Sequence, residues 1–122
     1  MRKIKLAGIY KILHLPTELF YIGYSSDIFM RWANHYMDCR QLKHSSTEFQ
    51  TLLITTSIEE FTFNIIEYCS IQNYRKISAL KGKPLELGFK KHLLEREQFH
   101  MSNHPIEFSL NKNKKYFKDL SK

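Results

Sequence analysis

The sequence predicts an α+β fold in which a small three-stranded antiparallel sheet is flanked by helices. Three segments rich in β-branched and aromatic residues are typical of strands, and segments with helical periodicity follow the second and the third of them. The order of two strands, two helices, one strand and one helix suits an antiparallel sheet covered by helices. With 122 residues, 43% of them hydrophobic, the chain is expected to form a single domain over 1–122 with a packed core.

The first two strands are predicted to form a hairpin. Segments 6–15 (LAGIYKILHL) and 18–24 (ELFYIGY) resemble strands, and the turn lies near Pro16. Tyr10 and Tyr21 stand in the two arms. Because side chains alternate between faces and opposed residues share a face, the two tyrosines share a face only if the turn holds an even number of residues. Cross-strand packing in the core is the usual reason for such a pair.

Two helices are predicted after the hairpin. Segment 25–39 (SSDIFMRWANHYMDC) begins at a serine or aspartate that can cap a helix. Its apolar face consists of four side chains: Ile28, Phe29, Trp32 and Tyr36. Arg31 and His35 are one turn apart at the border of this face, where an arginine more often reaches toward solvent than takes part in catalysis. Segment 44–54 (HSSTEFQTLLI) is the second helix, with capping-box spacing from Ser45.

The remaining elements are a third strand and a last helix. Segment 59–69 (EEFTFNIIEYC) alternates apolar and polar residues and is predicted to be a strand. Segment 70–88 is less regular and is predicted to be a long loop with room for one helical turn. A helix follows at 90–101 (KKHLLEREQFHM), and the basic segment from about residue 112 is predicted to be a loosely held tail.

The last helix carries a carboxylate on the stripe that should face the core. Three apolar residues define this stripe by their spacing of four or eight: Phe89, Leu93 and Met101. Glu97 falls on the same stripe, whereas Glu95 points toward water. A buried carboxylate usually acquires a cation, a metal ion or a raised pKa. A salt bridge to Lys90 or Lys91, or a position at the rim of the core, is the alternative explanation.

The overall charge favours a polyanionic partner. The net charge is +7 and the isoelectric point about 9.4, so nucleic acid is the first candidate and an anionic membrane surface the second. A basic protein without such a partner is equally compatible with charge alone. Cys39 and Cys69 form no paired motif and are expected to be reduced. Segment 1–16 is interrupted by lysines, so it predicts neither a signal peptide nor a membrane span, and we expect an intracellular protein.

Four short segments form a set with a known counterpart: GIY at 8–10, YIG at 21–23, SSDIFMRWANH at 25–35 and LLEREQF at 93–99. Ten residues separate the two triplets. The set resembles the GIY-YIG nuclease family over about residues 7–111. Within that family it is most similar to the catalytic domain of phage intron homing endonucleases, which KHSSTEFQ and FSLNKN also resemble.

This resemblance implies both a fold and a chemistry. The family has a three-stranded antiparallel sheet between helices and hydrolyses DNA phosphodiester bonds with one divalent cation, so Mg²⁺ or Mn²⁺ is the expected cofactor. By resemblance, Tyr10 would be a general base or a water-orienting group, and Tyr21 would line the same site. Arg31 would stabilise the phosphorane-like charge, and His35 would help to take a proton from Tyr10 or from the water. Glu97 would hold the metal ion.

Further residues are expected to support the site or to contact DNA. His44 and Asn111 match supporting positions of the family. Seven basic residues are expected to follow the DNA backbone: Arg75, Lys76, Lys81, Lys83, Lys112, Lys114 and Lys115. A solvated surface is the alternative for those between Cys69 and Gly88. Because the homing enzymes continue into a linker and a DNA-binding domain, we expect a homodimer, a separate DNA-binding partner or a nuclease of low specificity here.

The sequence therefore predicts a metal-dependent endonuclease acting on double-stranded DNA, of phage or mobile-element origin. It would work in the cytoplasm or nucleoid, or in an organelle matrix if it is organelle-encoded. Two alternatives stay open. One is a structure-specific repair or recombination nuclease of the same family. The other is a basic DNA-binding module that keeps the fold without turnover.

Overall fold

The structure is a computed structural model that describes residues 6–119, and it confirms the α+β fold. Three strands form one antiparallel sheet in the order β2-β1-β3: β1 (Ala7–His14), β2 (Phe20–Ser25) and β3 (Phe61–Cys69). The central strand is therefore the first one, and β2 and β3 form the two edges. None of the helices in the described part of the chain has the length and apolar character needed to cross a membrane.

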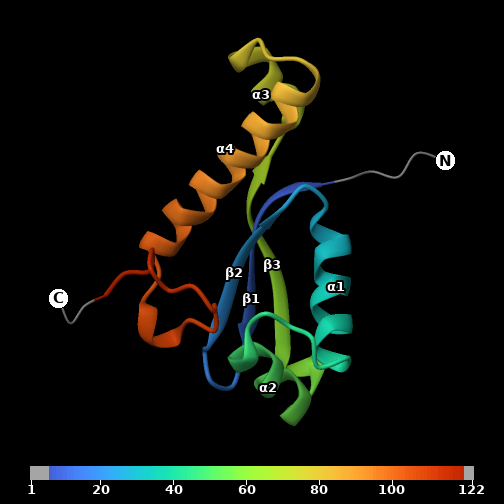
Figure 1. Ribbon diagram of the computed structural model, residues 1–122. Helices are drawn as coiled ribbons and strands as arrows, with labels where there is room; N and C mark the ends of the chain where they lie inside the picture. The colour runs from blue at the N-terminus through green and yellow to red at the C-terminus, as the bar shows by residue number, and fades with distance from the viewer. Residues whose placement is uncertain (1–5, 120–122) are drawn as a thin grey trace.

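Helices cover both faces of the sheet. Within residues 6–119 they are α1 (Ile28–Arg40), α2 (Thr47–Thr55), α3 (Ile71–Ser78) and α4 (Gly82–Ser102), with short 3₁₀ helices at Ile58–Glu60 and Ile106–Phe108. Figure 1 shows α1 and α2 on one side of the sheet and α4 on the other. Helix α3 and the first turns of α4 extend beyond the end of the sheet as an arm (Figure 1).

The hairpin turn decides which face the two tyrosines occupy. Six residues, 14–19, separate the last paired residues of the hairpin, Leu13 and Phe20. Because six is even, Tyr10 and Tyr21 share a face, and their ring centroids lie 6.5 Å apart. That face is turned toward α1 and α2.

Each face of the sheet has its own apolar core. Toward α1 and α2 the fully buried residues are Ile12, Cys39, Phe49, Leu53, Phe61 and Leu110. Toward α4 there are two clusters: one consists of Ile9, Phe20, Ile22, Met101 and Phe117, and the other of Cys69, Phe89 and Leu93. Cys39 and Cys69 are free thiols, and both are buried. The sheet separates the apolar clusters of its two faces. Side chains from opposite faces can therefore meet only around an edge of the sheet.

The segment 70–88, predicted to be a loop, instead forms α3 and the first two turns of α4. Ser70 caps α3, and Pro84 lies in the first turn of α4, where its missing N–H is not needed. A Cβ on Gly88 would lie 2.6 Å from the hydroxyl oxygen of Tyr74, so this glycine allows α3 and α4 to pack closely. Serine, proline and glycine usually indicate a loop, but here they cap a helix, begin a helix and allow two helices to pack.

Three smaller expectations were also wrong. The cap of α2 is Ser46 rather than Ser45, and its hydroxyl accepts a hydrogen bond from the Phe49 N–H (3.1 Å). Phe29 is 57% exposed, so it does not belong to the apolar face of α1. The segment after residue 112 is not loosely held as far as Asp119, because Phe117 is buried in the core beneath α4.

Candidate active site

Two tyrosines of the hairpin form the floor of the candidate site. Tyr10 is 1% exposed and Tyr21 is half-buried. Tyr10 pairs with Gly23 on β2, and a Cβ on that glycine would lie 2.2 Å from the Tyr10 hydroxyl oxygen. Glycine is thus needed at position 23 for the phenol to lie across β2. Burial raises the pKa of both phenols above the usual range.

Arg31 from the start of α1 interacts with both phenol groups. Helix α1 begins here because the Asp27 side chain accepts a hydrogen bond from the Met30 N–H (3.3 Å) and so caps the first turn. The half-buried guanidinium counteracts the effect of burial on the pKa of Tyr10 and of Tyr21. Arg31 therefore brings a permanent positive charge to the two phenols.

A chain of buried histidines lies behind Tyr10. The Ser46 N–H donates to Nδ1 of His44 (2.9 Å), so the proton of the neutral His44 ring is on Nε2. Nε2 of His44 lies 2.6 Å from Nδ1 of His35, and Nε2 of His35 lies 2.5 Å from the Tyr10 hydroxyl oxygen. His35 therefore receives a hydrogen bond on Nδ1 and donates one from Nε2 to the phenol oxygen.

Both histidine rings are neutral in the folded protein. Burial lowers the pKa of His35 to about 2, and the nearby Arg31 and His44 act in the same direction. The pKa of His44 is also lowered, chiefly by burial and then by Arg31. With these tautomers the Tyr10 oxygen accepts a hydrogen bond from Nε2 of His35. The phenol proton of Tyr10 therefore points away from His35. The resting arrangement thus makes His35 a donor to Tyr10, opposite to the proton-accepting role that the resemblance implies.

Glu97 reaches the phenols around the edge of the sheet. It belongs to α4, on the opposite face, and its carboxyl group accepts a hydrogen bond from the backbone of Tyr24 on edge strand β2. Its charge acts on both Tyr10 and Tyr21. Burial raises the pKa of Glu97 to about 7, against the opposing effect of the Tyr24 bond. The carboxyl group forms no ion pair within residues 6–119, so the expected alternative of a lysine partner does not apply.

Asn111 completes the same edge of β2. Its side-chain oxygen accepts from the Ile22 N–H (3.0 Å), and its side-chain nitrogen donates to the Ile22 carbonyl (2.7 Å). The Leu110 N–H donates to the Phe20 carbonyl (2.7 Å). The free edge of β2 is thus hydrogen-bonded to the C-terminal segment at Phe20 and at Ile22. Asn111 supports the site by holding β2 rather than by contacting the phenols.

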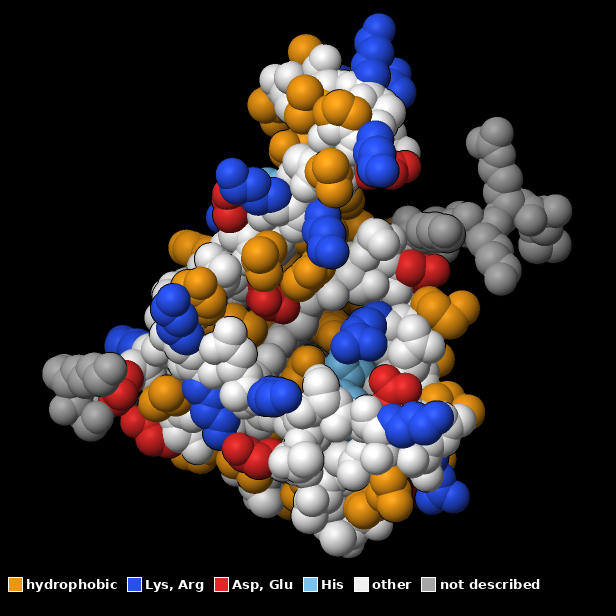
Figure 2. All heavy atoms as spheres, in the orientation of Figure 1, with side chains coloured by type: hydrophobic (Ala, Val, Ile, Leu, Met, Phe, Trp, Pro, Cys, Tyr) orange, Lys and Arg blue, Asp and Glu red, His pale blue; other side chains and the backbone are white. Residues whose placement is uncertain are grey.

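Two hollows meet at Glu97. The larger, about 1360 Å³, is lined by Tyr10, Tyr21, Arg31 and Glu97 and continues toward the arm. The smaller, about 420 Å³, is lined by Tyr21, Glu97, Asn111 and residues of the C-terminal segment. Figure 2 shows acidic, basic and histidine side chains around the hollow between α4 and α1. Tyr21 and Glu97 therefore border both hollows.

The donor set fits a cation shared with a substrate. No group of three His, Cys, Asp or Glu side chains in the described part of the chain could enclose a metal ion. Mg²⁺ is usually held by one or two carboxylates together with substrate phosphates and water. Glu97 supplies one partly buried carboxylate without a counter-charge, beside two phenol oxygens. These residues fit a hydrated Mg²⁺ or Mn²⁺ held jointly with a phosphate.

The basic residues predicted to contact DNA lie outside the larger hollow. Four are exposed on the arm: Arg75, Lys76, Lys81 and Lys83. Lys and Arg side chains stand along this arm in Figure 2. Lys112 lines the smaller hollow, Lys114 pairs with Glu48 (2.9 Å), and Lys115 lies over the Tyr116 ring. The same sequence reasoning missed Lys90, which lines the larger hollow two helical turns before Glu97 and so could have been found from its spacing.

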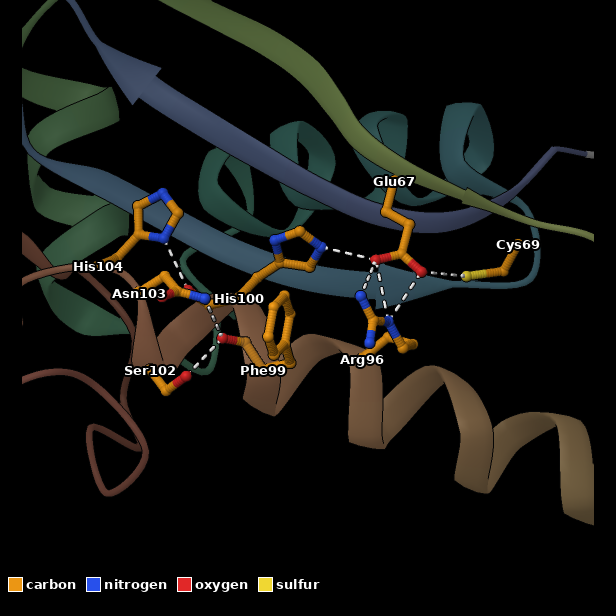
Figure 3. Close-up of polar contacts among 8 residues, drawn as sticks. All are labelled: Glu67, Cys69, Arg96, Phe99, His100, Ser102, Asn103 and His104. Atoms are coloured by element: carbon orange, nitrogen blue, oxygen red, sulfur yellow. Dashed lines mark hydrogen bonds and ion pairs between the residues drawn. The ribbon is translucent and has the colours of Figure 1, made fainter.

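A second polar cluster, which the sequence did not indicate, ties α4 to the other edge of the sheet. Glu67 points from β3 toward α4, where Arg96 and His100 lie (Figure 3). Arg96 donates to both carboxylate oxygens of Glu67 (2.8–3.0 Å), and Nε2 of His100 lies 2.8 Å from one of them. The hydrogen bonds from Arg96, followed by those from His100, lower the pKa of Glu67. Arg96 directly precedes Glu97, so this cluster sets the orientation of the helix that carries the site's carboxylate.

Comparisons with known proteins agree with this fold. The family model described as the GIY-YIG catalytic domain matches residues 6–100. A structure of a glutamate-to-alanine mutant of the catalytic domain of intron endonuclease I-TevI is similar, with a TM-score of 0.61 and 22% identity over 80% of this chain and 82% of that one. A structure of the catalytic domain of homing endonuclease I-TevI has a TM-score of 0.56 and 24% identity over 80% and 86%. No curated protein matches the sequence.

Proposed function

This chain belongs to the GIY-YIG family of endonuclease domains, and on that premise we propose that it hydrolyses phosphodiester bonds in double-stranded DNA with one divalent cation, Mg²⁺ or Mn²⁺. The observation that carries the proposal is the meeting of Tyr10, Tyr21, Arg31 and Glu97 in one hollow. The four side chains come from both faces of the sheet. Packing alone would not require a carboxylate, an arginine and two phenols to converge there.

Arg31 is proposed to bind the phosphate that is cleaved. Its guanidinium can donate two parallel hydrogen bonds to phosphate oxygens. Charge on these oxygens grows as water attacks phosphorus and the bond to the leaving oxygen breaks. Because Arg31 is held by α1 beside the phenols, its donors need little rearrangement during the reaction. A lysine would keep the charge but lose the paired geometry.

Tyr10 is proposed to orient the attacking water. Burial raises its pKa, so the phenol stays protonated in the free protein at neutral pH. His35 donates to the phenol oxygen, which leaves the phenol proton to a partner in the hollow. His35 and His44 then act as positioning residues that fix the direction of this hydrogen bond. Tyr21, half-buried beside Tyr10, lines the same water position.

Glu97 is proposed to hold the divalent cation. A bound cation supplies Lewis-acid stabilisation of the charge on the phosphate and the leaving oxygen. The carboxyl group forms no ion pair in the described structure, so it is available to a metal ion, and its raised pKa means that the free protein binds cations better as the pH rises through about 7.

The proposal extends to the origin of the protein, its partners and its compartment. A homing-type nuclease of phage or mobile-element origin is supported by the likeness to the two solved homing-endonuclease domains. The exposed cations on the arm would follow the DNA backbone. A second copy or a separate DNA-binding partner would supply sequence specificity. The working compartment would be the one that holds DNA, inside the cell.

The proposal is tested by incubating the protein with supercoiled plasmid in Mg²⁺, in Mn²⁺ and in a chelator. We expect nicked or linear plasmid with either cation and none with the chelator. The Glu97→Gln protein should not cleave, whereas Glu95→Gln, a matched change on the exposed side of the same helix, should cleave normally. Salt-sensitive DNA binding without cleavage in either cation would instead support a DNA-binding module. Unchanged cleavage by Glu97→Gln would contradict the metal assignment.

A further inference from the structure

Tyr68 is an aromatic residue on the active-site face of the sheet that the core does not use. Its side chain is 66% exposed, whereas Tyr10 on the same face is buried. Tyr68 on β3 pairs with Gly8, two residues before Tyr10 on β1, so the two rings stand on the same side of the sheet. Tyr68 also lines the larger hollow. An exposed ring therefore stands on the face of the candidate catalytic phenols, opposite a β1 residue that is two positions from Tyr10.

The β1 position paired with this ring carries no side chain, because it is the buried Gly8. The pairs Gly8–Ser25 and Gly8–Tyr68 form one row across the three strands. Gly8 has φ 154°, and a Cβ there would lie 2.0 Å from the Glu67 carbonyl oxygen, because β3 bulges against β1 at this point. No side chain can stand in the middle of the row. The ring of Tyr68 therefore has no β1 side chain between it and Ser25.

The hollow around Tyr68 is larger than phosphate chemistry requires. Its volume of about 1360 Å³ exceeds the roughly 300–1000 Å³ typical of small-molecule pockets. Its lining also contains Gln72 and Asn73, residues with amide side chains, and the Gln72 side-chain oxygen accepts a hydrogen bond from the Ser70 hydroxyl. An exposed aromatic ring with amide groups in the same hollow is suited to a nucleobase, which has a flat π-face and polar edges.

We infer that Tyr68 forms a stacking site for one nucleobase of the strand that is cut, next to the scissile phosphate. This inference rests on the proposed function, because the phosphate position is taken from Arg31 and Glu97. A base that stacks on Tyr68 has left its place in the duplex. DNA in which a base is already unpaired near the cut should therefore be a better substrate than a perfect duplex, because no pairing must be broken.

Binding measurements test the stacking site without any cleavage. In a chelator, fluorescence anisotropy would compare a labelled oligodeoxythymidine with an abasic strand of the same length and charge. We expect Tyr68→Ala to weaken binding of the thymidine strand by roughly 5- to 150-fold, the range for loss of one base–aromatic stack. The abasic strand should bind this variant as it binds the unaltered protein. Tyr68→Phe should retain tight binding.

A control variant shows whether the loss of binding is specific to Tyr68 or follows from removing any exposed aromatic ring. Phe29→Ala removes an aromatic side chain that is 57% exposed and does not line the hollow, so both strands should bind this variant normally. Equal weakening of both strands by Tyr68→Ala, or no weakening of either, would overturn the inference. Weakening by Tyr68→Phe equal to that by Tyr68→Ala would also contradict a stacking role.

Cleavage measurements keep the two proposals distinguishable. If the unaltered protein cleaves no plasmid in Mg²⁺ or Mn²⁺, the proposed function fails, and the binding result still decides the role of Tyr68. If the unaltered protein cleaves, a duplex with one mismatch beside the mapped cut should be cleaved with a lower KM than the matched duplex. Tyr68→Ala should abolish that difference in KM. If the difference persists in this variant, the stacking site is refuted while the proposed nuclease function stands.

Discussion

Replacing Glu97 with glutamine is expected to stabilise the folded protein above neutral pH while removing the carboxylate that the reaction needs. Burial raises the pKa of Glu97 from 4.5 to about 7. One pKa unit corresponds to about 1.36 kcal/mol, so ionising this group in the folded protein costs up to about 3 kcal/mol. Because the carboxyl group borders two open hollows, solvent reduces this value, and about 1–3 kcal/mol is expected.

The sign follows from the direction of the pKa change. A carboxyl group whose pKa is raised by folding has no cost while it is protonated in both states, below about pH 4.5. The cost develops as the pH rises from there to about 7 and is complete above it. Glutamine mimics the protonated acid in shape, and its side-chain oxygen can still accept from the Tyr24 backbone. The two proteins should therefore be equally stable in acid and diverge with rising pH.

Thermal unfolding followed by circular dichroism in a chelator would measure this divergence. We expect equal midpoints near pH 4.5, and a midpoint for Glu97→Gln that is higher by about 4–10 °C at about pH 8. Glu95→Gln should show no such pH-dependent gain. Adding Mg²⁺ should raise the midpoint of the unaltered protein and not that of Glu97→Gln. A difference between the two proteins that is constant at every pH would refute the reasoning.

Three other substitutions test the supports of the site. Gly23→Ala should lower kcat for plasmid cleavage by at least about tenfold, because the new Cβ displaces the Tyr10 hydroxyl; an unchanged kcat would contradict the need for glycine. His44→Ala should lower the free energy of unfolding, measured in urea, by about 1–3 kcal/mol and should also lower kcat, because Nδ1 of buried His35 loses its donor. Normal values of both would argue against the chain of histidine hydrogen bonds. Glu67→Gln should cost about 1–2 kcal/mol by weakening its bonds to Arg96 and His100, which urea unfolding would also measure; an unchanged midpoint would mean that α4 does not depend on this cluster.

Regular local patterns identified most of the fold and several site residues. The four-residue spacing around Glu97 was enough to find a carboxylate on a core-facing stripe, because helical periodicity is a property of neighbouring residues. The hairpin needed one further fact, the length of the turn, before Tyr10 and Tyr21 could be assigned to the same face. Likewise, the border position of Arg31 followed from the apolar face of α1.

Contacts between distant segments could not be predicted in this way. Gly88 reads as a loop signal until the ring of Tyr74 is seen against it, and Phe117 looks like part of a basic tail until its burial is known. The direction of the hydrogen bond from His35 to Tyr10 depends on the Ser46 N–H, and no residue type encodes a backbone donor. These features arise from tertiary packing, which a single sequence does not reveal.

Helix α4 is attached to both edges of the sheet by consecutive residues. Arg96 bonds to Glu67 on β3, and Glu97 bonds to the backbone of Tyr24 on β2. Any rotation of the helix about its axis, or any slip by one residue, would break both attachments together. The arm beyond this point can therefore differ in length or surface charge without moving Glu97 relative to the sheet.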